Sequence, residues 1–151
     1  MKNLLVFGII IMSYFKFNTG GLEFIRSNYY KAVEDKELCE KMIAELTKTK
    51  DNSATYLAYL GSFQTISANH VYSPFNKLNN FKEGKGNLEK AVKKEPNNVE
   101  VRFLRLSVQK KAPSFLGYKA NINEDTEFIK KNYHQIDSEI LQNYIQKLLK
   151  D

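Results

Sequence analysis

Apolar residues recur every three or four positions through nearly the whole of residues 22–149 of this 151-residue chain. This period matches one face of an α-helix, whereas a half-buried strand would alternate at every second residue. Residues that favour helix ends interrupt the pattern at regular intervals. The sequence therefore predicts an all-α domain of about seven helices, at about 22–33, 36–48, 53–72, 74–94, 99–110, 122–133 and 138–149.

The expected helix starts carry capping residues. Asp35 precedes the second helix, either Asn52 or Ser53 precedes the third, and Ser73 precedes Pro74 at the fourth. The side-chain oxygen of a capping residue accepts a hydrogen bond from the free amides of the first turn, and proline is tolerated there because its missing amide is not needed. These boundaries are therefore predicted from local chemistry.

The third helix carries a stripe of small residues, which recur at steps of three and four: Ala54, Ala58, Gly61, Thr65 and Ala68. Residues at this spacing lie on one helix face. Because small side chains leave room for a neighbouring backbone, we expect another helix to approach closely along this stripe.

The fifth helix is predicted to be the most buried. Its six apolar residues cover two adjoining stripes and leave four polar ones to face water: Glu100, Arg102, Arg105 and Gln109. The connection at 111–118 contains three large apolar side chains. We expect this connection to fold back on the core.

The N-terminal 21 residues match a secretory signal peptide. Lys2 is followed by an uncharged, mostly apolar run of 12 residues, 4–15, and then by Thr19, Gly20 and Gly21. The run is short for a bilayer-spanning helix, which needs roughly 20 residues, whereas a basic start, a short apolar centre and a small-residue end are typical of a signal. We expect cleavage after Gly21, a single domain over 22–151, and a periplasmic or secreted protein. A retained N-terminal membrane anchor, or a buried helix, is the alternative.

Cys39 is the only cysteine, so no disulfide can form within the chain. Its helical spacing with Met42, Ile43 and Leu46 predicts a buried thiol, and pairing with a second molecule is the alternative. Seven glycines and three prolines exclude a collagen-like chain, and an apolar content of 42% excludes a wholly disordered one. The stability of the domain must therefore come from its core.

Residues 84–98 resemble the second helix and closing turn of a tetratricopeptide repeat. Gly84, Leu88, Ala91 and Pro96 lie at that family's spacing, and Leu60-Gly61 is similar to the Leu-Gly pair of the repeat's first helix. The resemblance covers roughly 60–98, since the interval between Gly61 and Gly84 is longer than in the repeat and no further repeat signature follows. It implies a divergent stack of three antiparallel helical hairpins closed by a terminal helix. The whole chain also resembles small exported helical proteins that carry no assigned activity.

Three short patterns of catalytic or metal-binding proteins occur without their partner motifs. Ser107 and Lys110 match Ser-x-x-Lys, and 84–86 matches the start of a glycine-rich phosphate loop but lacks the third glycine and a preceding strand. Residues 121–125 have the alternating oxygen groups of a calcium loop, but helix capping accounts for them better. The two histidines, His70 and His134, lie in no set typical of zinc. We therefore expect no enzyme, no metal and no cofactor.

An aromatic group on the third helix is the main candidate site. Tyr56, Phe63 and His70 share a second stripe, and Tyr72 follows closely. His70 could bind a ligand or act as a general base in an aromatic pocket. Alternatively, it bonds to the carbonyl groups that a helix C-terminus leaves free.

Two arginines complete the candidate residues. Arg102 and Arg105 share a helix face and could clamp a carboxylate or a phosphate. Pairing with Glu89 or Glu100 is the alternative use.

The net charge of +6 is concentrated in residues 77–119, which hold eleven basic and four acidic side chains. A basic segment can attract an acidic partner or an anionic membrane surface. Lysines on helix faces are ordinarily solvated, and export argues against nucleic acid. We therefore expect no nucleic-acid partner, and a membrane-surface contact through 77–119 as a weaker alternative.

Two function classes remain. The first is an exported helical interaction or scaffold module that binds a protein or peptide partner in the cell envelope. We prefer this interpretation by analogy with other helical stacks. The second is a small-ligand binder, or an enzyme with few sequence signals, that has a pocket near His70.

Overall fold

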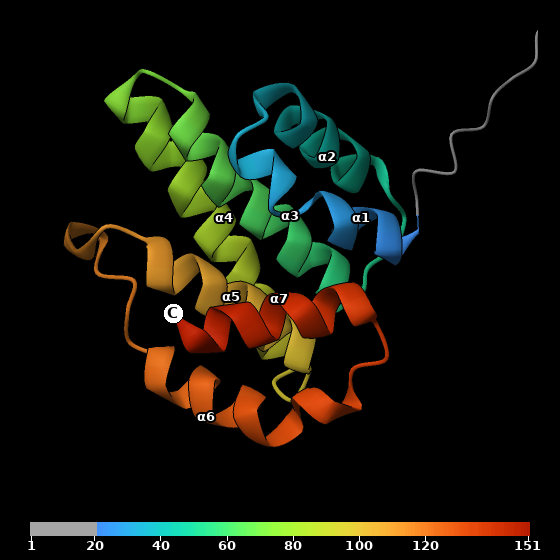
Figure 1. Cartoon of the computed structure of the whole chain (residues 1–151). Helices are drawn as coiled ribbons and strands as arrows, with labels where there is room; N and C mark the ends of the chain where they lie inside the picture. Colours follow the sequence, from blue (N-terminus) through green and yellow to red (C-terminus); the bar gives the residue numbers. More distant parts are fainter. Residues whose placement is uncertain (1–20) are drawn as a thin grey trace, which may run out of the picture.

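The computed structural model describes residues 21–151, which form seven α-helices and four short 3-10 segments (Figure 1). The helices are α1 (Leu22–Asn28), α2 (Lys36–Lys48), α3 (Ala54–Ser67), α4 (Pro74–Lys94), α5 (Val99–Lys111), α6 (Ile122–Asn132) and α7 (Glu139–Lys150). The 3-10 segments are η1 (Lys31–Val33), η2 (Ala68–His70), η3 (Ser114–Leu116) and η4 (Tyr133–Gln135). The described residues contain no strand, so the all-α prediction is confirmed. Apart from Gly21, the predicted signal peptide lies outside the described residues.

The predicted capping residues are confirmed. Asp35 Oδ1 accepts from the Leu38 amide at 2.9 Å, and Ser73 Oγ accepts from the Asn76 amide at 3.4 Å. Of the two candidates before α3, Ser53 is the cap, and its hydroxyl accepts from the Tyr56 amide at 3.3 Å. Local chemistry thus fixes the starts of α2, α3 and α4.

The first helix is shorter than predicted. It ends at Asn28, and the chain turns before it continues as η1. The side chains of Ser27 and Asn28 both donate to the Phe24 carbonyl, at 2.9 and 2.8 Å. Side-chain groups that bond to a helix carbonyl compete with the backbone and weaken the helix locally.

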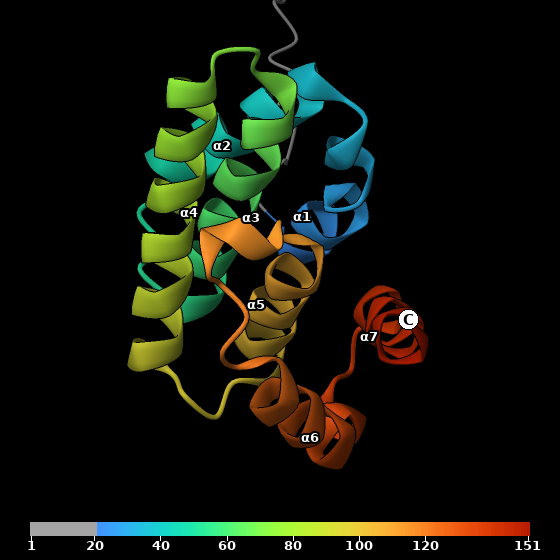
Figure 2. The ribbon, with the colours of Figure 1, turned by 90° about the vertical axis from the view of Figure 1, so that its left-hand side faces the viewer.

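Helices α3 and α4 form an antiparallel hairpin and cross at two glycines (Figures 1 and 2). A Cβ atom on Gly61 would lie 2.6 Å from the Gly84 carbonyl oxygen, and one on Gly84 would meet Gly61 O and, at 2.7 Å, the Thr65 amide nitrogen. The expected close approach at the small-residue stripe is confirmed.

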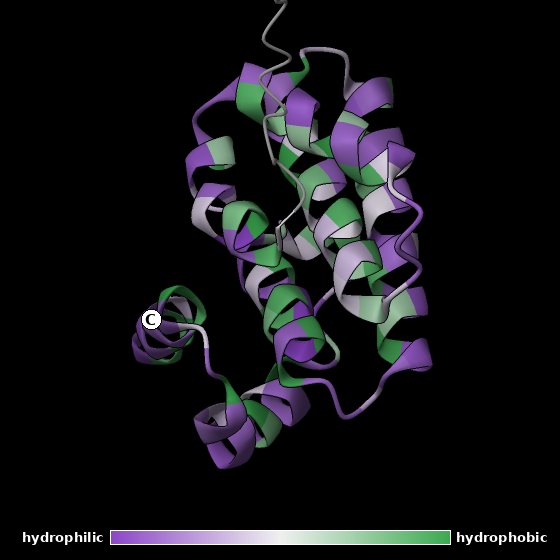
Figure 3. Ribbon diagram, turned by 90° about the vertical axis from the view of Figure 1, so that its right-hand side faces the viewer, coloured by the Kyte–Doolittle hydropathy of each residue, from purple (hydrophilic) through white to green (hydrophobic). Residues whose placement is uncertain are grey.

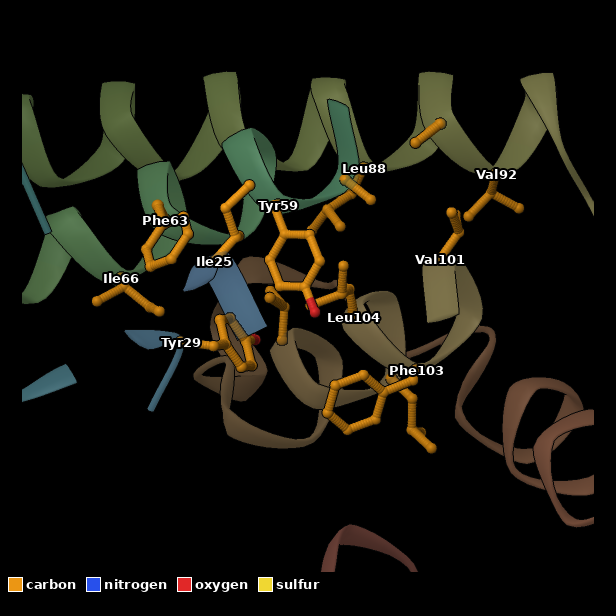
Figure 4. Close-up of a cluster of buried hydrophobic side chains, with 14 of the residues drawn as sticks. Ile25, Tyr29, Tyr59, Phe63, Ile66, Leu88, Val92, Val101, Phe103 and Leu104 are labelled. Carbon is orange, nitrogen blue, oxygen red and sulfur yellow. The ribbon is translucent and has the colours of Figure 1, made fainter. Parts of the chain in front are cut away.

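Helix α5 lies at the centre of the described domain, antiparallel to α4 (Figure 2). Its apolar residues meet the aromatic side chains of α1 and α3 in the core, where Tyr29 makes edge contacts with Phe63 at 5.9 Å and with Phe103 at 6.2 Å between ring centroids (Figure 4). The prediction that α5 is the most buried helix agrees with this position. The prediction that its four polar residues face water is wrong, because Glu100, Arg102, Arg105 and Gln109 are all buried.

The last two helices run across the direction of α4 and α5 (Figures 1 and 2). Helix α7 contacts α1 and α5 and, seen end-on, is hydrophilic on one side and hydrophobic on the other (Figure 3). Its buried residues are Leu141, Ile145 and Leu148. Among residues 21–151, no helix combines the length and the apolar character needed to cross a membrane.

The connection between α5 and α6 folds back only in part. Tyr118 is buried as expected, but Phe115 in η3 is 86% exposed. Gly117, which follows η3, has a φ of +64°, a backbone conformation that L side chains rarely adopt. The left-handed turn at Gly117 ends η3 and separates the exposed Phe115 from the buried Tyr118.

Candidate functional site

An apolar pocket of about 470 Å³ lies between five parts of the chain. Its walls come from the residues that follow α1 together with η1, the end of α3 with η2, the first half of α4, the end of α5, and η3. The lining residues are Tyr29, Tyr30, Val33, Thr65, Ile66, Ala68, Asn69, Pro74, Lys77, Leu78, Phe81, Ser107, Val108, Lys111, Ala112, Pro113, Phe115 and Leu116. Its volume is within the range of about 300–1,000 Å³ that small-molecule sites occupy.

Two hydroxyl groups in the pocket wall, those of Tyr29 and Thr65, are already hydrogen-bonded within the protein. The Tyr29 hydroxyl donates to Ser107 Oγ at 3.2 Å, and the Thr65 hydroxyl donates to the Ser62 carbonyl at 2.7 Å. Burial raises the pKa of Tyr29 above its ordinary value, so this phenol stays protonated at neutral pH. The interior therefore offers a guest mainly apolar surface.

The charged residues that line the pocket are both lysines, Lys77 and Lys111. Both are exposed, and they come from different walls, α4 and α5. Lys111 Nζ lies 5.7 Å from the centroid of the Tyr30 ring, which also lines the pocket. Leu78, 39% exposed, and Phe115 place further apolar surface at this solvent-accessible edge.

The predicted aromatic group does not come together around one cavity. Phe63 is fully buried in the core, Tyr56 is half-buried against it, and Tyr72 is fully exposed. None of these three lines the apolar pocket. Tyr56 and Phe63 lie on α3, whereas Tyr72 follows η2 and points its side chain into solvent.

His70 does not line the apolar pocket either. It lies in a second, more polar cleft of about 360 Å³ between α2, α3 and α4. Its Nε2 atom is 2.8 Å from the Ala32 carbonyl oxygen, so the ring bridges η2 and η1. This bond matches the alternative in which His70 satisfies a backbone carbonyl, although the carbonyl belongs to η1 rather than to its own helix. Cys39 lines the same cleft, and burial raises the pKa of its thiol to about 12.

Replacing His70 with alanine is expected to lower the free energy of unfolding by about 1 kcal/mol, because one partly buried hydrogen bond is lost. Titration with the neutral apolar probe N-phenyl-1-naphthylamine should give the same result as for the wild-type chain, because His70 does not line the apolar pocket. Chemical denaturation and ligand titration of the same variant measure the two effects. His134→Ala, at an exposed position, is the matched control and should leave both values unaltered. Loss of ligand uptake in His70→Ala would instead make His70 a binding residue.

Arg102 and Arg105 do come together, on a carboxylate of the same chain. Arg105 Nε and Nη2 donate to the two oxygens of Asp125 at 2.7 and 2.8 Å, and Arg102 Nη1 donates to Asp125 Oδ1 at 2.7 Å. Asp125 is fully buried on α6. Burial acts to lower the pKa of both guanidinium groups, but their hydrogen bonds to carboxylates outweigh it and raise both pKa values. The clamp is therefore occupied by Asp125 and joins α5 to α6.

The predicted arginine–glutamate pairs are half correct. Arg105 Nη1 does bond to Glu89, at 3.2 Å. Glu100 instead takes two hydrogen bonds from Arg26, at 2.8 and 2.5 Å, and one from the Tyr59 hydroxyl at 2.7 Å. This second ionic group ties α1 and α3 to α5.

The short sequence patterns form no reactive arrangement. Ser107 Oγ is bonded to Tyr29, whereas Lys110 Nζ donates to the Leu148 carbonyl at 2.8 Å. The side chain of Asn121 does not cap α6, contrary to the capping prediction for 121–125. In the part of the chain that the structure describes, no three His, Cys, Asp or Glu side chains gather in a way that could hold a metal ion.

Several basic side chains of the segment 77–119 have partners within the protein. Arg102 and Arg105 are buried in ion pairs, and Lys110 and Lys119 donate to backbone carbonyls. Two of the remaining lysines, Lys77 and Lys111, are at the pocket. The charge excess that the sequence displays is thus partly neutralised inside the protein.

The sequence alone does not reveal the pocket, because its walls come from segments that are far apart in the chain. One signal was present: the connection at 111–118 carries large apolar residues that a free linker would lack. Phe115 and Leu116, from that connection, form part of the wall.

The chain matches no protein-family model, no curated protein and no solved structure.

Proposed function

We propose that this protein is a non-enzymatic binding module that takes an apolar ligand into the pocket between η1, α3, α4, α5 and η3. The observation that carries the proposal is the pocket itself: about 470 Å³, with walls that are apolar except at Lys77 and Lys111 and a few hydroxyl or amide groups. When a ligand covers apolar surface that is otherwise exposed to water, the complex is stabilised by about 25 cal/mol for each Å² that is buried.

Of the two function classes expected from the sequence, this is the small-ligand binder. Its site, however, is the apolar pocket and not the surroundings of His70. The pocket adjoins η2, which contains His70, but it is formed on the side of Ala68 and Asn69. The signal-like pattern of residues 1–21 supports a periplasmic or extracellular place for this function.

The test is a titration of the full-length chain with the neutral fluorescent probe N-phenyl-1-naphthylamine, whose emission rises in apolar surroundings. We expect saturable binding of one probe per chain. Ala112 is buried in the pocket wall, so Ala112→Phe should fill the space and weaken binding about tenfold or more, which is about 1.4 kcal/mol.

The matched control is Ala44→Phe, which adds the same side chain at an exposed position in the second cleft and should leave probe binding unchanged. Leu78→Gln alters the pocket at a partly exposed position and covers the case in which Ala112→Phe fails to fold; it should weaken binding severalfold. Equal binding by wild type, Ala112→Phe and Leu78→Gln would refute the pocket as the site.

A protein or peptide partner is the second candidate function, and exposed aromatic residues favour it. Phe115, Tyr72 and Phe75 are 86%, 100% and 72% exposed, and Phe115 lines the pocket. Phe115 and the partly exposed Leu78 both line the pocket, and exposed apolar surface that gathers in one place is typical of interaction sites. An amphipathic helical peptide that displaces the probe, where its scrambled sequence does not, would support this function.

A further inference from the structure

We propose that the ligand of this pocket is a single-chain amphiphile with an anionic head group, whose alkyl chain enters the pocket while its head group meets Lys77 and Lys111. This inference rests on the proposed function and adds the chemical class of the ligand. It follows from the distribution of charge around the pocket.

Among residues 21–151, no aspartate or glutamate lines the pocket, and neither Lys77 nor Lys111 forms an ion pair. Asp151, at the end of α7, helps to raise the pKa of Tyr30, after the larger effect of burial, but it does not pair with Lys111. No acidic side chain of the described residues therefore neutralises either ammonium group, and both can meet an anion from outside the protein.

The positions of the two lysines suit a guest with a charged end. Lys77 belongs to the first turns of α4 and Lys111 is the last residue of α5, so they approach from two walls. A lysine buries its methylene stem along apolar surface and keeps its ammonium group in water. This arrangement places positive charge where the pocket meets solvent.

The interior suits an alkyl chain better than a polar guest. Its deep wall includes Ile66, Val108 and Ala112, each at most 9% exposed, and the hydroxyls of Tyr29 and Thr65 already have partners. A guest with polar groups along its length would lose hydrogen bonds to water without replacement. Each methylene group that enters should instead raise affinity about fourfold until the pocket is full.

The test is displacement of N-phenyl-1-naphthylamine from the full-length chain by four ligands of equal chain length, used below their micelle concentrations. They are dodecanoate, dodecyl phosphate, dodecan-1-ol and dodecyltrimethylammonium. We expect the two anions to bind about tenfold more tightly than the alcohol, and the cation to bind most weakly. The tighter of the two anions identifies the head group as carboxylate or phosphate.

The variant Lys77→Gln/Lys111→Gln should reduce the affinity for the anions to that for the alcohol and leave the alcohol unaffected. The matched control is Lys82→Gln/Lys90→Gln, which removes the same charge from exposed positions of α4 away from the pocket. This control should retain the preference for anions.

The outcomes separate the inference from the proposed function. Equal affinity for alcohol and anions in the wild-type chain overturns the amphiphile inference, while saturable probe binding that Ala112→Phe abolishes still supports the pocket. Absence of saturable probe binding refutes both. Displacement by the amphipathic peptide at lower concentrations than by either anion would overturn the inference in favour of a peptide ligand.

Discussion

Replacing Gly84 with alanine is expected to lower the free energy of unfolding by about 2–3 kcal/mol, one of the two largest effects of a single substitution that we expect here. The added Cβ atom would meet the Gly61 carbonyl oxygen and, at 2.6 and 2.7 Å, Thr65 Cγ2 and the Thr65 amide nitrogen. Two of these three are backbone atoms of α3, which cannot rotate away. Helices α3 and α4 would therefore have to separate, and urea denaturation followed by circular dichroism measures the cost.

Gly86, two residues further along α4, is the matched control because a Cβ atom there meets nothing within 4 Å. Gly86→Ala gains helix propensity without a clash, so it should raise the free energy of unfolding by about 0.5–1 kcal/mol. The two substitutions are chemically identical and should act in opposite directions. If Gly84→Ala were as stable as wild type, α3 and α4 could not cross as closely as the contacts at Gly61 and Gly84 require.

Replacing Asp125 with asparagine is expected to cost about 3–5 kcal/mol, because it leaves Arg102 and Arg105 as buried charges without their shared partner. Asp125 is fully buried and accepts three hydrogen bonds from the two guanidinium groups. Glu124 and Glu89 still contact the arginines, but their side chains are 59% and 41% exposed. The midpoint and slope of urea denaturation measure the loss.

Glu127 on the same helix is the control for Asp125. It pairs with Lys130 at 3.1 Å, and both side chains are more than half exposed. An exposed pair contributes about 0–1 kcal/mol, so Glu127→Gln should change stability little. If Asp125→Asn cost no more than Glu127→Gln, Asp125 could not be the buried link between α5 and α6.

A triple variant distinguishes the destabilisation caused by unpaired buried charges from the net contribution of the ion pairs to stability. Arg102→Met, Arg105→Met and Asp125→Leu together remove the three buried charges, keep side-chain volume nearly constant and leave Glu89 and Glu124 to solvent at their partly exposed positions. Replacement of a whole buried ionic group by apolar residues is often neutral or stabilising. We expect the triple variant to recover most of the stability that Asp125→Asn loses.

Much of the helical architecture follows from local sequence. The spacing of apolar residues predicts each of the seven helices, and capping side chains fix where α2, α3 and α4 begin. The ends of the first and third helices are the exceptions, since α1 ends at Asn28 and α3 at Ser67, short of the predicted 33 and 72. A periodic pattern does not reveal that Ser27 and Asn28 bond to the Phe24 carbonyl. Helix identity is local, and helix ends depend on individual side-chain bonds.

The polar residues of α5 show where reasoning from one helix fails. Its apolar residues cover two stripes, so Glu100, Arg102, Arg105 and Gln109 were expected on a solvent face. Burial of a charge is tolerated only when an opposite charge and hydrogen bonds accompany it, and the acidic or basic partners lie 16 or more residues away in sequence, on α1, α4 and α6. The sequence contains these partners, but no local pattern shows which residues form the pairs.

The sequence by itself thus determines that residues 22–151 form an all-α domain, where most of its helices begin, and that a neighbouring helix can approach the small-residue stripe of α3 closely. Periodicity, capping and side-chain size act over a few residues, so they can be read along the chain. Only the tertiary structure decides that Arg102 and Arg105 bind Asp125 and that η1, η2, α4, α5 and η3 enclose an apolar pocket with Lys77 and Lys111 at its edge. Both features arise where segments distant in sequence meet, and no local pattern of residues specifies which segments those are.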